Sequence, residues 1–250
     1  MINIKSDWEL DIMRTCAHVT GEILRDLAGY IEPGMSTLDI NQFVENRIRK
    51  AKMTPSFLGL YDFPASACIS VNEEVVHGIP RADRILKEGD IVSVDTGATY
   101  KGYVSDAART YPVGEVSQVA KDLMAAAEKG FFAAIEFAKP GCRVSDISHA
   151  VQETVEAEGF GIVRELVGHG VGRVMHEDPQ IPNYGKAGRG PRIAKGMVFA
   201  IEPMITEGTY EVEVLDDEWT YVTADRKMAA HYENSVIITD GKPEIITLVK

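Results

Sequence analysis

The chain has 250 residues, 45% of them hydrophobic, and a formal net charge of −12 at pH 7. This length and apolar content suffice for one large core or two small ones. The negative charge argues against a general nucleic-acid or anionic-membrane surface, because either would need a basic stripe. The cysteines Cys16, Cys68 and Cys142 are widely spaced and form no CxxC pair. Their pattern argues against a disulfide framework or a zinc finger and fits a reducing, cytoplasmic compartment.

The N-terminal region predicts two helices. The first begins after Ser6, which forms a capping-box pattern with the glutamate three residues later, and its apolar stripe continues to Leu27. The second runs from Ser36 or Thr37 to the basic residues that end at Lys50. The start of the chain lacks the charged, apolar and cleavage segments of an export signal, and no apolar run approaches the roughly 20 residues of a membrane span. We therefore expect neither export nor a membrane anchor.

The next predicted strands lead to a hairpin that brings two aspartates together. We predict strands at 67–71 and 91–94 and a hairpin over 92–110 that turns about Tyr100 and Lys101. In that register Asp95 and Asp106 are directly opposed, with Cβ atoms roughly 5 Å apart on one face of the ladder. Two carboxylates this close repel each other unless one is protonated or a cation lies between them. The hairpin alone leaves two interpretations open, a solvated pair of unconnected aspartates or a metal site.

The second half of the chain repeats the order of the first. Helices are predicted at 119–137 and 145–158, and strands at 163–166, 197–201, 210–215, 219–222 and 235–239. Pro140-Gly141 follows Pro33-Gly34 at the same offset at which Gly196 follows Gly89, and similar strands come after these last two glycines. We therefore predict an α+β chain with one domain over 1–250, built from two related halves of about 1–113 and 114–250 that share one curved sheet with the site between them.

Acid, base and metal-binding side chains recur in five regions of the sequence. They are His77, the Asp95 and Asp106 pair, His169 with His176, Glu202, and Glu233. Each alone is more often an ordinary polar residue, but Glu202 follows an apolar strand pattern in which an ionised carboxylate needs a partner. Four carboxylates with imidazoles suit hard to borderline divalent ions, and bridging carboxylates suit two ions roughly 3.5 to 4 Å apart.

Several other kinds of site do not fit the sequence. The segment after His176 lacks the second histidine of HExxH, which excludes a zincin helix. Gly168, Gly170 and Gly172 suggest close backbone approach in a loop, because GHGVGR does not open a capped helix as a nucleotide-binding fingerprint does. No Gly-x-Ser-x-Gly elbow is present, although spacing alone leaves Ser/His/Asp and Cys/His triads open.

Taken together, the sequence blocks resemble the signature of the type I methionine aminopeptidases in the pita-bread metalloprotease family. The blocks are ACISVNEEVVHGIP, the two aspartates eleven residues apart, GHGVGRVMHEDPQIPNYG, GMVFAIEPM and YENSV, which together span 67–236. The resemblance implies the α+β pita-bread fold, whose two pseudo-twofold related halves share a curved antiparallel sheet. This expectation agrees with the internal repeat at one constant offset.

The resemblance also implies a set of metal ligands. Two divalent ions (cobalt, manganese, iron or zinc) would be held by Asp95, Asp106, His169, Glu202 and Glu233. Asp106 and Glu233 would bridge the ions, whereas His77 and His176 would face the substrate.

The implied reaction is metal-dependent removal of the N-terminal methionine from nascent proteins and peptides whose second residue is small. Glu202 would accept a proton from the attacking water, His176 would help hold the oxyanion, and His77 would contact the scissile-bond nitrogen. The methionine side chain would enter an apolar pocket formed by Phe63, Cys68, Trp219 and Leu60. Phe63, Tyr61 and Met175 depart from the residues common in the family, which leaves the pocket details and the size limit for the second residue open.

Two alternative functions are compatible with the same fold. One is a sister enzyme that cleaves at proline, such as aminopeptidase P or prolidase, which usually carries an additional N-terminal domain that this chain lacks. The other is a pita-bread binding module without catalysis, against which the intact set of five ligands argues. We expect a cytoplasmic monomer that acts on nascent N-termini, with no nucleic-acid or membrane partner, and ribosome docking remains open.

Overall fold

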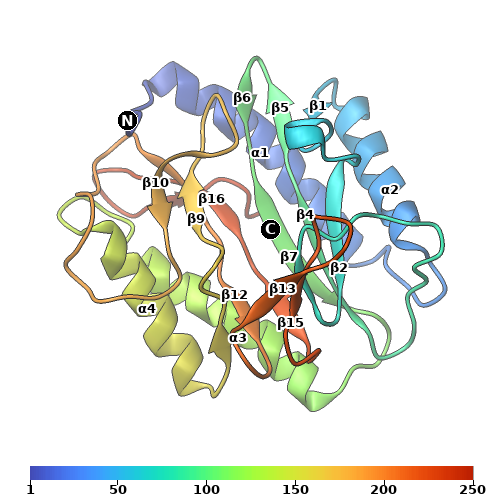
Figure 1. The fold of residues 1–250 in the computed structure, drawn as a ribbon. Coiled ribbons are helices and arrows are strands. Elements are labelled where there is room, and N and C mark those ends of the chain that lie inside the picture. The colour runs from blue at the N-terminus through green and yellow to red at the C-terminus, as the bar shows by residue number, and fades with distance from the viewer. Residues whose placement is uncertain (250) are drawn as a thin grey trace.

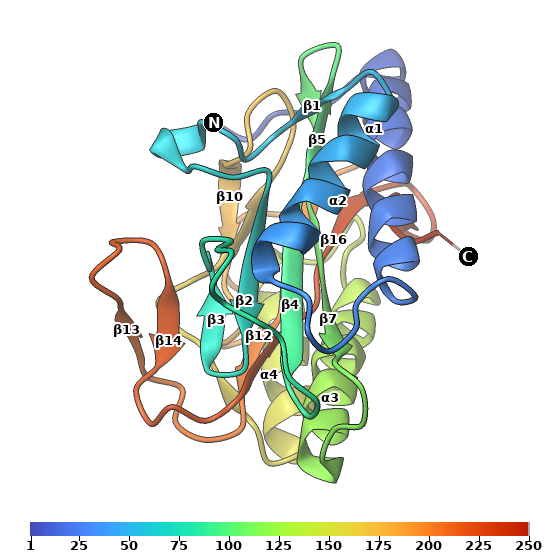
Figure 2. The same ribbon diagram turned by 90° about the vertical axis from the view of Figure 1, so that its right-hand side faces the viewer.

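The computed structural model describes residues 1–249, in which four α-helices lie on one side of the strands (Figures 1 and 2). The helices are α1 (Asp7–Leu27), α2 (Thr37–Lys50), α3 (Gln118–Ile135) and α4 (Val144–Ala157), with a short 3-10 helix η1 (Leu60–Asp62). On the side opposite the helices, η1 and the β13–β14 hairpin project from the strands (Figure 2). None of the helices within 1–249 is long and apolar enough to span a membrane.

The strands are short, and many have only two or three residues. In the first half they are β1 (Thr54–Pro55), β2 (Ala67–Val71), β3 (Glu74–Val76), β4 (Ile91–Thr96), β5 (Ala98–Tyr100), β6 (Tyr103–Val104) and β7 (Ala107–Pro112). In the second half they are β8 (Gly161–Ile162), β9 (Gly168–Gly170), β10 (Glu177–Ile181), β11 (Val198–Ile201), β12 (Met204–Thr206), β13 (Val212–Val214), β14 (Tyr221–Thr223), β15 (Ala229–His231), β16 (Asn234–Ile237) and β17 (Glu244–Ile245).

The predicted helices are confirmed to within two residues at each end. The capping box at the start of α1 forms as predicted, because Ser6 donates from its backbone N–H and its hydroxyl to the Glu9 carboxylate at 2.8 and 2.7 Å. Each helix buries one apolar face. In α2, for example, Ile40, Val44 and Ile48 are fully buried in the core that also contains β2 and β4.

Each half of the chain contains a main antiparallel sheet backed by two helices, and three smaller sheets, β1-β5-β6, β15-β12-β8 and β13-β14-β3, pair most of the remaining strands. In the first half the strand order is β2-β4-β7, and α1 and α2 pack against the strands of that half. In the second half the order is β10-β9-β11-β16-β17, and α3 and α4 pack on each other in a core that reaches these strands. An isolated antiparallel β-bridge pairs the backbones of Ser36 and Ile85 in the first half, and another pairs those of Arg143 and Arg192 in the second. Both members of the second bridge follow those of the first at the offset seen in the sequence.

Backbone hydrogen bonds join the two halves between β7 and the segment 231–235. Glu233 N–H donates to the Ala108 carbonyl at 3.0 Å, and the Ser235 hydroxyl donates to the Asp106 carbonyl at 2.8 Å. Ser235 Oγ also accepts from Asp106 N–H at 3.1 Å. These contacts place Asp106 from the first half beside Glu233 from the second.

The predicted register of the central hairpin is wrong by two residues. The ladder turns at Lys101-Gly102 rather than at Tyr100-Lys101, and the ladder partner of Asp95 lies two residues beyond Asp106. The φ angles of Lys101 and Gly102 are 48° and 77°, and a two-residue turn with two positive φ angles matches the twist of the flanking strands. Asp106 is therefore a diagonal neighbour of Asp95 on the same face, not its direct partner.

The strand predictions are mixed. The strands at 67–71 and 197–201 are confirmed, and the one at 91–94 extends to residue 96. The strand predicted at 163–166 is wrong, because pairing there is limited to β8 at 161–162. The strand predicted at 219–222 begins two residues later. The three-residue strands β3, β12 and β15 were missed because strands this short depend on their tertiary partners, and the longer β10 was also missed.

Candidate metal centre and active site

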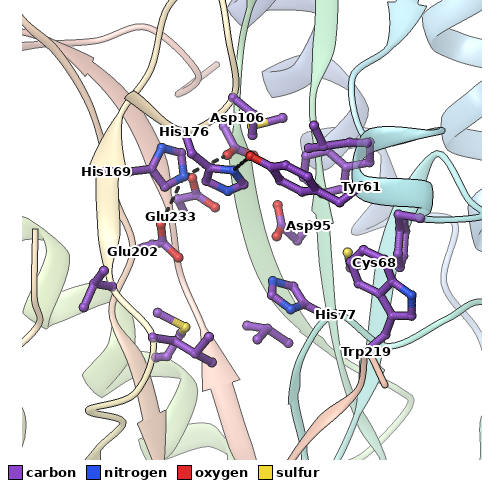
Figure 3. Close-up of a pocket in the computed structure, with 18 residues that line it drawn as sticks. Tyr61, Cys68, His77, Asp95, Asp106, His169, His176, Glu202, Trp219 and Glu233 are labelled. Carbon is purple, nitrogen blue, oxygen red and sulfur yellow. Dashed lines mark hydrogen bonds and ion pairs between the residues drawn. The ribbon is translucent and has the colours of Figure 1, made fainter. Parts of the chain in front are cut away.

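Two buried carboxylates, two half-buried carboxylates and one histidine, which lie in or next to different strands, surround a common space (Figure 3). Asp95 lies in β4, Asp106 directly precedes β7, His169 lies in β9, Glu202 directly follows β11, and Glu233 lies between β15 and β16. The structure thus brings together all five residues that the resemblance implies as metal ligands.

His169 connects two of the carboxylates. Its Nε2 atom lies 3.5 Å from Asp106 Oδ2 and 3.5 Å from Glu202 Oε1. Its Nδ1 atom lies 2.8 Å from the Gly170 carbonyl oxygen, which can only accept, so Nδ1 carries the proton. The Nε2 lone pair is therefore directed toward the carboxylates, as it is in a metal-binding histidine whose other nitrogen is held by a carbonyl.

The chemistry of these side chains fits divalent ions. Asp106 and Glu233 are only 4% and 1% exposed. Among the described residues, Asp95 Oδ1, Asp106 Oδ1 and Glu233 Oε1 are buried without any hydrogen-bond partner. Buried carboxylate oxygens without partners are costly, and oxygen-rich sites with an imidazole suit borderline and hard cations. Asp106, His169 and Glu233 also offer donor atoms that all lie within 4.8 Å of one another.

Burial raises the pKa of every carboxyl group in the cluster. Desolvation raises the pKa of Asp106 to about 8 and that of Asp95 well above its usual value, with the Asp106 charge adding to the shift of Asp95. Desolvation, followed by repulsion from both aspartates, raises the pKa of Glu202 and Glu233 well above their usual values. Without a cation, the cluster therefore keeps protons near neutral pH.

Two further histidines line the cavity in neutral form. Burial lowers the pKa of His77 to about 4, with a further contribution from His176. Burial and then His169 lower the pKa of His176 to about 4. The His169 and His176 rings are 4.5 Å apart. A neutral imidazole can donate one hydrogen bond to substrate without bringing a charge into the cluster.

The glycines around His169 allow close backbone contact, but within a strand rather than the predicted loop. A Cβ atom on Gly168 would lie 2.6 Å from the Ala200 carbonyl oxygen, and one on Gly170 would lie 2.2 Å from the Asp178 carbonyl oxygen. The Ala200 carbonyl belongs to β11 and the Asp178 carbonyl to the bulged part of β10, and these two strands flank β9. Glycine therefore lets β9 carry His169 between β10 and β11.

The cavity has a volume of about 180 Å³, and its walls away from the carboxylates are apolar. The four predicted pocket residues Leu60, Phe63, Cys68 and Trp219 all line it. The rings of Phe63 and Trp219 meet edge to face with centroids 5.1 Å apart. Sites for drug-sized ligands span about 300–1,000 Å³, so this space suits one side chain and a short stretch of backbone.

Tyr61 covers one side of the cavity. Its ring stacks on His176 with centroids 5.8 Å apart, and its hydroxyl lies 3.4 Å from His176 Nδ1 (Figure 3). The side chain is largely exposed, and the residue has a φ of 50°. Positive φ is costly for a tyrosine, and such strain is concentrated at functional sites.

Sequence reasoning missed one residue of the cluster, His231. Its Nε2 lies 3.6 Å from Glu233 Oε2 and 3.9 Å from Glu202 Oε2, and burial lowers its pKa to about 3. The available signal was the spacing, because a residue two positions before Glu233 in an extended segment lies on the same face.

The chain is similar to known metallopeptidases over nearly its whole length. Residues 11–240 match the profile described as Metallopeptidase family M24. A protein of Clostridium acetobutylicum described as methionine aminopeptidase is 51% identical over 248 residues, which cover 99% of both chains. The crystal structure of a methionine aminopeptidase from Thermotoga maritima is 46% identical, covers 99% of both chains and has a TM-score of 0.97.

More distant structures share the fold alone. An Xaa-Pro dipeptidase from Bacillus anthracis has a TM-score of 0.80 at 23% identity, and the match covers 99% of this chain but 62% of the other. Together with the closer structures, this likeness confirms the predicted α+β pita-bread fold class.

Proposed function

The chain belongs to metallopeptidase family M24, and from that premise we propose that it removes the N-terminal methionine from proteins and peptides whose second residue is small. The observation that carries the proposal is the joint placement of four carboxylates, two of them buried and two half-buried, and His169 beside an apolar cavity for one side chain. Full-length similarity to methionine aminopeptidases supports the same function.

M24 membership implies the use of divalent metal, and we propose that this chain binds two ions. Asp95, Asp106, His169, Glu202 and Glu233 would hold them, with Asp106 and Glu233 shared. The ions could be cobalt, manganese, iron or zinc. Bound divalent ions would lower the pKa of water and polarise the scissile carbonyl.

The protein's own groups have separate roles in the proposed reaction. Glu202 accepts a proton from the attacking water, because its carboxylate lines the cavity beside the other proposed ligands. His176 donates a hydrogen bond to the oxyanion from the edge of the cavity, and His77 contacts the nitrogen of the scissile bond. Phe63, Trp219 and the neighbouring apolar side chains bind the methionine side chain and exclude water from it.

We also propose the organisation and setting of the enzyme. The chain acts as one catalytic domain over 1–250, with related halves of about 1–113 and 114–250. It works as a cytoplasmic monomer on nascent polypeptide N-termini, where docking on the ribosome would bring it to its substrate. The matching bridges at equivalent positions of the two halves support the two-half organisation.

Substrate specificity gives a direct test of the proposed function. In a peptide series Met-Xaa-Ser-Tyr, turnover should be high when Xaa is Gly, Ala or Ser and should fall by about 10²-fold or more when it is Leu or Lys. A long second side chain would displace the scissile carbonyl, and a displacement of about 1 Å can cost that much in rate. Tyr61 and Met175 lie beside His176, so they should set the size limit. Equal turnover across the series would contradict the steric limit. Cleavage of peptides that begin with Leu or Phe as fast as those that begin with Met would contradict the methionine pocket.

The two neighbouring histidines His169 and His176 should respond differently to replacement. His176→Ala should lower turnover by about 10²-fold with metal affinity nearly unchanged, as expected for loss of one oxyanion donor. His169→Ala should weaken metal binding itself. Calorimetric titration with Mn²⁺ and peptide turnover should be measured on both variants. Identical metal titrations for the two would contradict this division of roles.

A further inference from the structure

His231 is a fully buried histidine beside the carboxylates that the proposed reaction leaves without a role. Its side chain is 1% exposed, and neither ring nitrogen has a hydrogen-bond partner among residues 1–249. His231 is not among the described residues that line the cavity. The ring therefore lies beside the carboxylates without lining the cavity that the substrate would enter.

The position of His231 is fixed by its backbone. Its N–H donates to Thr110 Oγ1 at 2.9 Å, and the Thr110 hydroxyl donates to the His231 carbonyl at 2.9 Å. On its other edge it pairs with Met204 between β15 and β12. Because the backbone is held on both sides, the imidazole is kept beside the cluster although the ring itself makes no hydrogen bond.

The ring is within reach of the carboxylates but not yet bonded to them. Nε2 lies 3.6 Å from Glu233 Oε2, and donor atoms of His231, Glu233 and Asp95 all lie within 4.8 Å of one another. A hydrogen bond from a ring N–H to a carboxylate is about 2.7–2.9 Å long, so an approach of less than about 1 Å would form one. Ionised carboxylates only accept, and those that bind metal are usually held by such outer hydrogen bonds.

We propose that His231 is a positioning residue that donates its Nε2–H to the Glu233 carboxylate in the metal-loaded protein. This inference rests on the proposed metal-dependent function. The imidazole holds Glu233 Oε2 in a fixed orientation, so that Glu233 can be shared between two ions. Asp95, His231 and Glu233 also have the spacing of a metal-binding group, so direct ligation by His231 is the alternative that the second measurement below distinguishes.

The test compares a variant without a donor with one that keeps an N–H donor. His231→Leu should raise the Kd for Mn²⁺ by about 10- to 100-fold in calorimetric titration, the usual cost of losing an outer hydrogen bond. His231→Gln should restore most of this loss. His18→Leu, at an exposed histidine of α1, is the matched control and should bind as the unmodified chain does. Unchanged affinity in His231→Leu, or equal losses in the leucine and glutamine variants, would overturn the proposal.

A second measurement reads the position of the His231 ring proton in the unmodified chain. With histidine labelled by ¹⁵N and the protein loaded with Zn²⁺, the spectrum should show His231 protonated at Nε2 and protected from solvent exchange. The signal is assigned by its loss in His231→Gln. An unprotonated Nε2 on His231 would overturn the proposal, because the ring would then be a ligand or an acceptor.

The two levels of the inference can fail separately. If the unmodified chain binds no divalent ion and cleaves no methionyl peptide, the proposed function fails. If it binds two ions and cleaves the peptide while His231→Leu binds metal equally well, the positioning role alone fails.

Discussion

Asp106→Asn and Glu233→Gln should each abolish peptide turnover and lower the metal content below two ions per chain. Each replacement removes one negative charge from a site where, among the described residues, Asp106 Oδ1 and Glu233 Oε1 are buried without a hydrogen-bond partner. The charge of two ions would then be poorly balanced in a site of low polarity, where a missing partner costs several kcal/mol. Metal analysis after gel filtration, together with turnover of a methionyl peptide, measures both effects.

Asp11→Asn is the matched control for these variants, because Asp11 is an exposed partner of Arg14 on α1. It should keep full activity and full metal content. If Asp106→Asn or Glu233→Gln retained full activity with two bound ions, the proposal of a shared dinuclear centre would be wrong.

The metal-free protein should lose stability as the pH rises through neutrality. The pKa of Asp106 is raised to about 8, whereas an unfolded aspartate has a pKa of about 4. A group whose pKa is raised in the folded state contributes stability that is present below the unfolded pKa and is lost as the pH rises through the folded pKa. Each carboxyl that stays protonated should lower the melting temperature by about 3 °C per pH unit in this window.

Calorimetry in a chelator between about pH 6.5 and 8 measures this loss. The buried histidines with lowered pKa, such as His77, oppose this loss below about pH 7.5, because the unfolded chain still protonates them there, so the upper end of the range gives the clearest reading. Excess Mn²⁺ should restore the melting temperature, most strongly at the upper end of the range. Asp106→Asn should flatten the pH dependence of the metal-free protein. A metal-free melting temperature that rises with pH would contradict the shifted carboxyl groups.

The parts of the fold that follow from local patterns could be read from the sequence. The caps and apolar stripes of the helices depend on residues three or four apart, so α1 and α2 were located to within a residue or two. The hairpin register failed because the turn is set by the two positive φ angles at Lys101-Gly102, and Gly102 was not used as the turn signal. The prediction that the two aspartates share a face survived, because a shift of two residues preserves the face.

The site was predictable where residue type and neighbours limited the chemistry. Glu202 stands at the end of an apolar strand, and such a carboxylate requires a partner. His231 had a weaker signal, because its spacing from Glu233 indicates only a shared face, and pairing with β7 and β12 is needed to fix the ring beside the carboxylate. Similarly, the stacking of Tyr61 on His176 joins residues that are far apart in sequence, and only the folded chain brings them together.

The central claim is that the chain is a metal-dependent enzyme that removes N-terminal methionine. It is tested most directly by measuring metal content and the turnover of a Met-Ala-Ser peptide against an Xaa-Pro peptide in the same preparation. The account predicts two divalent ions per chain, rapid cleavage of Met-Ala-Ser that stops in a chelator, and little cleavage before proline. Preferential cleavage of the Xaa-Pro peptide would instead indicate a proline-specific peptidase, and metal binding without cleavage of either peptide would indicate a binding module.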